Sequence, residues 1–175
     1  MKTLGLLRHA KSDWSDADKR DFDRGLNARG RKGAALMGNH VRAYEQTWDL
    51  LLASPAERVR RTLDAADLRL TPVFDERLYL ANAPTILEVV RDHAGGSGGV
   101  LVAGHNPGLQ DVLLELVPPS AENALFDEAV AKFPTAAFAV IDLSIDDWAQ
   151  LGTGPATISH FARPRDLDPA LGPED

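Results

Sequence analysis

The hydrophobic positions of this chain fall into short runs, and longer stretches with helical spacing separate these runs. Short apolar runs bounded by turn-forming residues are typical of strands. We expect strands over residues 2–7, 49–53, 71–74, 100–103, 136–143 and 157–161. The run over 100–103 is apolar at every position, which favours a strand covered on both faces. The run over 157–161 favours an edge strand.

Helices are expected between these strands, over residues 27–44 and 84–93 and onward from Ser54 and from Asn106. Ser54 would be the N-cap of its helix, because a proline follows at the first helical position and a glutamate stands three residues after the cap. Strands that alternate with helices predict an α/β protein with a mainly parallel central sheet. The expected fold class is therefore a single-domain, three-layer αβα architecture.

Several segments fit neither pattern. Residues 12–25 are polar and charged and predict a long loop, and residues 94–99 contain four glycines and predict a flexible connection. The pattern over 120–134 leaves helix and loop open, and this segment could cover a site. We expect the domain to span residues 1–163, followed by a C-terminal tail over 164–175, which contains three prolines.

Basic residues follow three of the predicted strands. Arg8 and His9 come directly after the first run, and His105 comes two residues after the run over 100–103. Arg58 lies in the first turn of the helix expected after the run over 49–53. In a parallel sheet, the carboxyl ends of the strands meet at one edge, where ligands bind. We therefore expect these four side chains to lie together although they are far apart in the sequence.

Composition narrows the functional classes. The 175 residues suffice for one domain with a substantial core. The absence of cysteine excludes disulfides, thiolate metal sites and cysteine nucleophiles, and it fits a reducing, cytoplasmic compartment. A net charge of -7 argues against nucleic acid as the main partner. No apolar run has the length of a membrane span or of a signal-peptide core, so we expect no membrane association.

The residue types at this edge suit phosphoryl chemistry. A neutral imidazole at His9 can attack phosphorus and hold the phosphoryl group covalently. Guanidinium groups at Arg8 and Arg58 can bind phosphate oxygens through paired donors, and the start of the helix that carries Arg58 also favours an anion. His105 can donate to a phosphoryl oxygen as charge develops. A lone histidine is most often structural and a lone helical arginine is most often solvated, so the prediction depends on their joint placement.

At this point the sequence resembles the histidine phosphatase superfamily. Its motifs are matched by Arg8-His9-Ala10, by Ser54-Pro55-Ala56-Glu57-Arg58-Val59-Arg60-Arg61-Thr62 and by Gly104-His105-Asn106-Pro107-Gly108. The Lys-Ser after the first motif and the Asp-Arg-Gly-Leu-Asn-Ala-Arg-Gly over 23–30 resemble the SixA-type phosphohistidine phosphatase branch. The resemblance covers residues 1–164 and implies a phosphoglycerate mutase-like fold. It implies that His9 accepts the phosphoryl group and that Arg8, Arg58 and His105 complete the phosphate pocket.

The sequence departs from the phosphoglycerate mutase branch at two places. Ser15 stands where that branch has an asparagine that touches phosphate, and we include Ser15 with Arg24 among the candidate substrate-binding residues. Leu80 aligns with that branch's glutamate proton donor. Glu76 is the nearest carboxylate and a possible proton donor, although a solvated loop glutamate is an equally good interpretation. An imidazole leaving group needs less help from an acid than a sugar alkoxide does, so the missing acid favours phosphohistidine or activated phosphomonoesters.

The leading hypothesis is a metal-independent phosphatase, without a cofactor, that hydrolyses phosphohistidine or a small phosphomonoester through a phosphohistidine at His9. Its partner would be a phosphorylated small molecule or a phosphohistidine protein. One alternative is a module that binds a phosphorylated ligand without effective turnover. Another is a mutase or sugar phosphatase of the same superfamily.

Overall fold

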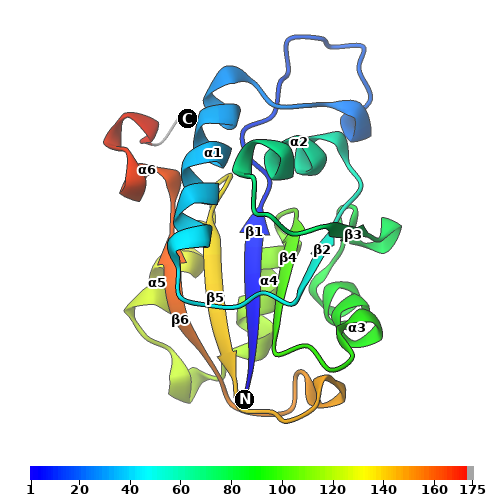
Figure 1. Cartoon of the computed structure of the whole chain (residues 1–175). Helices are drawn as coiled ribbons and strands as arrows, with labels where there is room; N and C mark the ends of the chain where they lie inside the picture. The colour runs from blue at the N-terminus through cyan, green and yellow to red at the C-terminus, as the bar shows by residue number, and fades with distance from the viewer. Residues whose placement is uncertain (173–175) are drawn as a thin grey trace.

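The computed structural model describes residues 1–172 as a six-stranded sheet with helices on both faces (Figure 1). The strand order is β3-β2-β4-β1-β5-β6. The strands are β1 Lys2–Arg8, β2 Leu50–Ala53, β3 Pro72–Phe74, β4 Gly99–Gly104, β5 Phe138–Leu143 and β6 Ala156–Ala162. The helices are α1 Ala28–Ala43, α2 Glu57–Ala66, α3 Ala83–Ala94, α4 Gly108–Leu116, α5 Ala124–Ala131 and α6 Pro164–Leu167.

The sheet is parallel where the site residues lie. β1 and β2 both pair in parallel with β4, and β3 pairs in parallel with β2. Only β5 and β6 run antiparallel to their neighbours, and β6 forms an edge of the sheet. The expected three-layer, mainly parallel α/β fold is therefore confirmed. The carboxyl ends of β1, β2 and β4 meet at the upper edge of the sheet in Figure 1, below α2 and the loop that follows β1.

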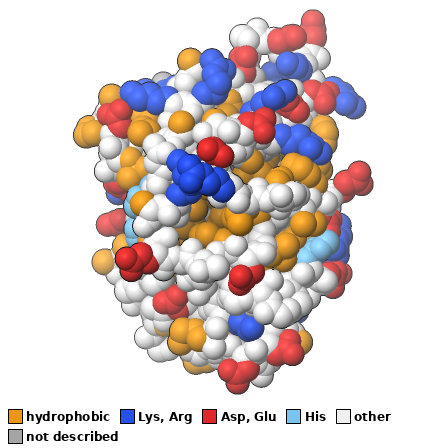
Figure 2. All heavy atoms as spheres, in the orientation of Figure 1, with side chains coloured by type: hydrophobic (Ala, Val, Ile, Leu, Met, Phe, Trp, Pro, Cys, Tyr) orange, Lys and Arg blue, Asp and Glu red, His pale blue; other side chains and the backbone are white. Residues whose placement is uncertain are grey.

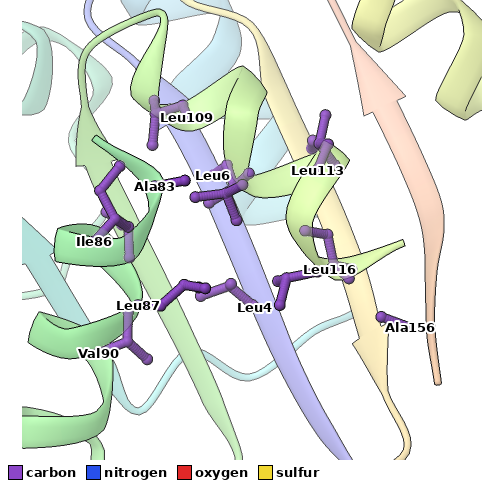
Figure 3. Close-up of a cluster of buried hydrophobic side chains, with 14 of the residues drawn as sticks. Leu4, Leu6, Ala83, Ile86, Leu87, Val90, Leu109, Leu113, Leu116 and Ala156 are labelled. Carbon is purple, nitrogen blue, oxygen red and sulfur yellow. The ribbon is translucent and has the colours of Figure 1, made fainter. Parts of the chain in front are cut away.

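Two apolar cores hold the three layers together. Leu4 and Leu6 on β1 point to the face that α3 and α4 cover, where they meet Leu87, Leu109 and Leu113 (Figure 3). Leu7 belongs to the opposite core, with side chains from α1 and α2. This alternation along β1 follows from the two-residue period of a strand. The alternation therefore determines to which face of the sheet each side chain of β1 points.

The helices α1 and α2 approach each other closely at one glycine. A Cβ atom at Gly38 of α1 would collide with the backbone carbonyl of Ala66, the last residue of α2. The two helices can therefore pack with their backbones in near contact only because this position lacks a side chain. The packing places the beginning of α2, which carries Arg58, beside the residues that follow β1.

The structure corrects the predicted beginning of α2. Helix α2 begins at Glu57, its N-cap residue is Ala56, and no side chain caps it. Ser54 is fully buried just beyond β2, where its hydroxyl contacts His105. The sequence pattern of a helix cap was therefore misleading, because the hydroxyl serves a contact across the sheet.

The structure also describes the three segments that fitted neither the strand nor the helix pattern of the sequence or were predicted as tail. The loop over 12–25 is mostly irregular and contains one short 3-10 helix, η1 Asp21–Asp23. The segment over 120–134 includes α5, which packs against α4 and β6. Residues 164–172, which we predicted as tail, form α6 and the 3-10 turn η5 Pro169–Leu171, and the Asp168 carboxylate pairs with Lys32 of α1 at 3.0 Å. Among the described residues, no helix is both long and apolar enough to cross a bilayer.

Candidate active site

The structure brings Arg8, His9, Arg58 and His105 together at the carboxyl edge of the parallel strands. The ring centroids of His9 and His105 are 5.4 Å apart. Arg8 and Arg58 are close enough to both imidazoles to lower their pKa values. The side chains of Arg58, His9 and His105 are almost completely buried. Their juxtaposition follows from the parallel pairing of β1 and β2 with β4.

The geometry of His9 fixes its tautomer. The Nδ1 atom lies 2.8 Å from the backbone carbonyl oxygen of Ala10. Because a carbonyl can only accept a hydrogen bond, Nδ1 must carry the proton and the lone pair of the neutral ring remains on Nε2. Burial lowers the pKa of His9 to about 3, with further lowering by Arg8, His105 and Arg58 and an opposing effect of the Ala10 carbonyl. At neutral pH His9 is therefore an uncharged imidazole with Nε2 available as a nucleophile.

His105 is held through its other ring nitrogen. Its Nε2 atom lies 2.7 Å from the hydroxyl oxygen of Ser54. Its Nδ1 atom is buried and has no hydrogen-bond partner among residues 1–172. Burial and the charge of Arg58 lower the pKa of His105 to about 4. A neutral ring with one nitrogen held and the other unsatisfied is prepared to bind a ligand atom.

Arg8 is anchored by the segment that precedes β5. One of its terminal nitrogens donates to the Phe133 carbonyl oxygen at 2.9 Å, and the side-chain amide of Asn106 donates to the same oxygen at 3.0 Å. The Nε atom of Arg8 is buried without a hydrogen-bond partner in the part of the chain that the structure describes. Burial and the nearby Arg58 charge lower the pKa of Arg8, which remains far above neutrality for a guanidinium. Arg8 thus retains an unsatisfied donor beside the nucleophile.

Arg58 makes a contact that the sequence did not indicate. Its two terminal nitrogens donate to the backbone oxygen of Asp21 at 2.9 Å and to the Asp21 carboxylate at 3.1 Å. The Tyr79 hydroxyl donates to the same carboxylate at 2.5 Å. The Tyr79 ring also meets His105 edge to face, with centroids 5.5 Å apart. Asp21 and Tyr79 therefore border the cluster, although no motif singled them out.

The two candidate substrate-binding residues of the 12–25 loop are placed differently. Arg24 is buried, donates to the Asp16 carbonyl oxygen at 2.8 Å and lies over the ring of Trp14 at 4.1 Å. These contacts organise the loop itself. Ser15 is exposed, and its backbone N–H donates to the Asp13 carboxylate at 2.9 Å. Neither residue makes a hydrogen bond or ring contact with the four clustered residues in the described structure.

Glu76 lies at the surface, in the 3-10 helix η2 Glu76–Leu78. Within residues 1–172 its carboxylate makes no hydrogen bond or ion pair. The neighbouring Asp75 carboxylate pairs instead with Arg77 and His93, on the side of α3. Asp21 is the carboxylate that reaches the cluster in the described structure, where it contacts Arg58.

A basic cleft adjoins the cluster. It encloses about 250 Å³ and is lined by α1, by α6 and by the segment before β5. Within residues 1–172, the lining includes six cations and no acidic side chain: Arg8, Lys11, Arg29, Lys132, Arg163 and Arg165. Lys and Arg side chains are also frequent over the upper half of the face shown in Figure 2. In a protein of net charge -7, this local concentration marks a surface suited to anions.

No group of three or more histidine, aspartate and glutamate side chains in residues 1–172 is arranged to hold a metal ion. The donors of the cluster are guanidinium and imidazole groups, which suit an anionic ligand. The arrangement can bind a phosphoryl group, present it to His9 Nε2 and neutralise its charge.

Comparison with known proteins identifies the family. A family model described as the histidine phosphatase superfamily (branch 1) matches residues 4–79. Rv1276c, an uncharacterised protein of Mycobacterium tuberculosis, is 34% identical over 160 residues, which are 91% of this chain and 100% of that protein. The chain belongs to the histidine phosphatase superfamily. The family match includes the Arg8-His9 motif, Arg58 and Tyr79, and His105 lies beyond it.

Two solved structures are similar to this chain over most of its length. SixA from Nakamurella multipartitia superposes with a TM-score of 0.82 at 30% identity, covering 93% of this chain and 96% of that one. SixA from Agrobacterium tumefaciens has a TM-score of 0.75 at 28% identity, covering 92% of this chain and 97% of that one. Both are described as candidate phosphohistidine phosphatases. The resemblance to the SixA-type branch is therefore confirmed.

Proposed function

We propose that this protein is a metal-independent phosphatase that transfers a phosphoryl group first to His9 Nε2 and then to water, and that its substrate is phosphohistidine. The observation that carries the proposal is the state of His9. The Ala10 carbonyl holds the proton on Nδ1, and burial keeps the ring neutral. A histidine that served only as a structural hydrogen-bond donor would not need two arginines and a second histidine beside its ring.

In the first step, Arg8 and Arg58 bind the oxygens of the incoming phosphoryl group. The lone pair of His9 Nε2 attacks phosphorus, the bond between phosphorus and the leaving group breaks, and the leaving group takes the bonding electrons. In the second step, water attacks the same phosphorus, inorganic phosphate departs with the oxygen of that water, and the electron pair returns to Nε2. The arginines stabilise the charge on the equatorial oxygens in both steps.

His105 acts as a donor to the phosphoryl oxygen. The Ser54 hydroxyl accepts from the Ala56 backbone N–H at 3.3 Å and keeps its own proton for donation. We assign the ring proton of His105 to Nδ1, with the Ser54 hydroxyl donating to Nε2, and Nδ1 is the buried atom that has no partner within residues 1–172. An unsatisfied buried donor costs free energy until a ligand satisfies it. A phosphoryl oxygen would supply that partner.

The surroundings of the leaving group favour phosphohistidine over a sugar phosphate. A phosphohistidine whose second ring nitrogen is protonated leaves as neutral imidazole and needs no proton from the enzyme. A sugar alkoxide needs a positioned acid. Glu76 is exposed and apart from the cluster, and the pKa of Asp21 is lowered, so Asp21 is ionised at neutral pH. Neither carboxylate is prepared as a proton donor.

The basic cleft supports a protein as the carrier of the phosphohistidine. Lys132 and Arg165 extend the positive region beyond Arg8, farther than a single phosphoryl group requires, whereas Arg163 is paired with Asp166 and Glu128. Acidic side chains around a phosphohistidine on a partner protein would match this surface. The SixA structures described as candidate phosphohistidine phosphatases add support from relatives.

Rapid quenching with a labelled phosphohistidine protein tests the mechanism. Wild type should form a phosphoenzyme that is labile in acid and stable in base, with the label on His9. His9→Ala should form none and should lose turnover while remaining folded. The matched control is His93→Ala, because His93 lies on α3 and contacts Asp75. Label on a serine or a carboxylate, or turnover that persists in His9→Ala, would contradict the mechanism.

A substrate panel tests the specificity. Phosphohistidine protein should be hydrolysed with a far higher kcat/KM than sugar phosphates or nucleotides, and an aryl phosphate should fall between them. If a sugar phosphate is hydrolysed equally well or better, the protein is still a phosphatase, but phosphohistidine is not its substrate.

A further inference from the structure

The Arg58 donors that would bind the phosphoryl group are already occupied by Asp21. Both terminal nitrogens of the guanidinium donate to this residue, one to its backbone oxygen and the other to its carboxylate. A guanidinium binds a phosphate best through two parallel donors. Asp21 therefore occupies the pair formed by the two terminal nitrogens, and a phosphate that binds Arg58 through this pair must displace it.

A second contact holds Asp21 in this position. The Tyr79 hydroxyl donates to the carboxylate oxygen that Arg58 also contacts. Tyr79 is itself placed by the edge-to-face contact of its ring with Phe22, at 5.0 Å between centroids. Partial burial raises the pKa of Asp21, but the hydrogen bonds from Tyr79 and Arg58 outweigh this effect and the net pKa is lowered. The carboxylate is thus charged and competes as an anion.

Asp21 can leave without disturbing the core. Its side chain is 43% exposed, whereas that of Arg58 is 6% exposed. Residues 14–20 of the same loop are all exposed, and the base of the loop is held separately by the bridge between Ser12 and Leu26. The side chain of Asp21 can therefore leave Arg58 while the neighbouring Phe22 stays packed against the core and Arg24 stays buried.

We propose that Asp21 is a positioning residue that competes internally with the phosphoryl group for Arg58, so that substrate binding displaces it and its return helps to release inorganic phosphate. This inference rests on the proposed function only in that Arg58 binds the phosphoryl group. With Asp21 in place, Arg58 keeps its orientation, but the paired donors of its terminal nitrogens are occupied. With a phosphoryl group in place, the loop loses its contact with Arg58.

Such competition lowers the affinity of every ligand that binds Arg58 by a measurable factor. A ligand that binds only when Asp21 is displaced has its affinity reduced by the fraction of molecules in the displaced state. The factor is the same for every ligand that uses Arg58. Removing the competitor should therefore lower the dissociation constants of inorganic phosphate, orthovanadate and substrate by one common factor. We expect this factor to be about threefold to tenfold, which corresponds to a displaced fraction of roughly one third to one tenth.

The experiment compares Asp21→Asn with Asp23→Asn. Asp23 lies in the same 3-10 helix and pairs with the exposed Arg20, so its replacement removes the same charge without touching Arg58. Calorimetry should give a lower Kd for inorganic phosphate in Asp21→Asn than in Asp23→Asn. The Ki of orthovanadate and the KM of an aryl phosphate should fall by the same factor. Tyr79→Phe should give a smaller gain in the same direction.

A double-mutant cycle with Arg58→Ala locates the effect. In the Arg58→Ala background, Asp21→Asn should bring no gain beyond that of Asp23→Asn, because the shared guanidinium is gone. Hydrogen exchange of residues 14–24 should become faster when wild type binds phosphate, since displacement frees the loop. This second measurement does not depend on how well the variants fold.

Several results would overturn the inference. Weaker phosphate binding in Asp21→Asn would mean that Asp21 supports Arg58 for ligand binding. Equal phosphate binding by Asp21→Asn and Asp23→Asn would mean that Asp21 acts only through its negative charge and does not compete for Arg58. A loss of kcat with unchanged affinity would make Asp21 an acid or base in the chemistry. If wild type binds no phosphate and Arg58→Ala changes nothing, the proposed function itself fails, which is a distinct outcome.

Discussion

The backbone N–H of Ala10 donates a hydrogen bond of 2.9 Å to the Thr62 hydroxyl, and this hydroxyl donates to the Arg58 carbonyl oxygen at 2.7 Å. The contact joins the residue after the nucleophile to the helix of the phosphate-binding arginine, although the sequence separation is 52 residues. The Ala10 carbonyl also fixes the tautomer of His9. One buried hydroxyl thus holds the turn that orients the nucleophile.

Thr62→Val should test this brace. Valine has nearly the same shape but leaves the buried Ala10 N–H without an acceptor, which costs about 1–3 kcal/mol of folding stability. We also expect kcat to fall by about tenfold, because the turn that places His9 loosens. Thr62→Ser keeps the hydroxyl and should retain most of the activity. Urea unfolding and steady-state kinetics measure the two effects, and equal kcat values in Thr62→Val and Thr62→Ser would show that the brace is irrelevant to catalysis.

The pKa values of His9 and His105 predict a loss of stability in acid. Burial lowers them to about 3 and about 4, so between pH 6.5 and these values the unfolded chain binds protons that the folded protein excludes. The stabilising contribution is complete above pH 6.5 and is lost as the pH falls. Each histidine should cost about 1.4 kcal/mol per pH unit in this range.

Urea unfolding at several pH values between 7 and 4.5 checks this dependence. His105→Asn removes one of the two titrating groups, so its stability should fall less steeply with decreasing pH than that of wild type. The difference in slope should approach about 1.4 kcal/mol per pH unit. Parallel profiles for the two proteins would mean that His105 titrates normally in the folded state.

Leaving-group dependence should reveal whether any acid assists the first step. Without a proton donor, the rate should rise steeply as the pKa of the leaving group falls. Because Glu76 is exposed and apart from the cluster, Glu76→Gln should leave alkyl and aryl phosphates equally unaffected. Kinetics with a series of substituted phenyl phosphates and one alkyl phosphate measure the slope. A selective loss of alkyl phosphate hydrolysis in Glu76→Gln would establish Glu76 as the donor and weaken the case for phosphohistidine.

The basic cleft predicts a difference between protein and small substrates. Lys132→Glu and Arg165→Glu should raise KM for a phosphohistidine protein several-fold at low salt and leave the kinetics of phenyl phosphate unchanged. Salt should diminish the effect, because exposed charges are screened over about 8–10 Å. The control is Lys19→Glu, since Lys19 is exposed on the 12–25 loop and is not part of the cleft lining. An equal rise of KM for Lys19→Glu would mean that the net charge of the protein, and not the cleft, causes the effect.

The sequence predicted the parts of the site that depend on regular structure. Arg8, His9 and His105 follow strands whose apolar runs are readable, and parallel pairing then places those strand ends side by side. The three-layer fold follows from the same alternation of strands and helices, and the comparisons confirm it. Ser54 shows the limit of local patterns, because a helix-capping signature concealed a hydroxyl that pairs with His105 across the sheet.

By itself, the sequence determined which elements form, in what order, and which strand ends carry chemical groups, because hydrophobic periodicity is a local property of the chain. Only the tertiary structure decided what those groups contact. The approach of Asp21 and Tyr79 to Arg58, the brace from Thr62 to Ala10 and the surface position of Glu76 depend on the paths of loops. Such paths are set by contacts between distant residues, which no local pattern records, and these contacts decide which donors of the site are available to a ligand.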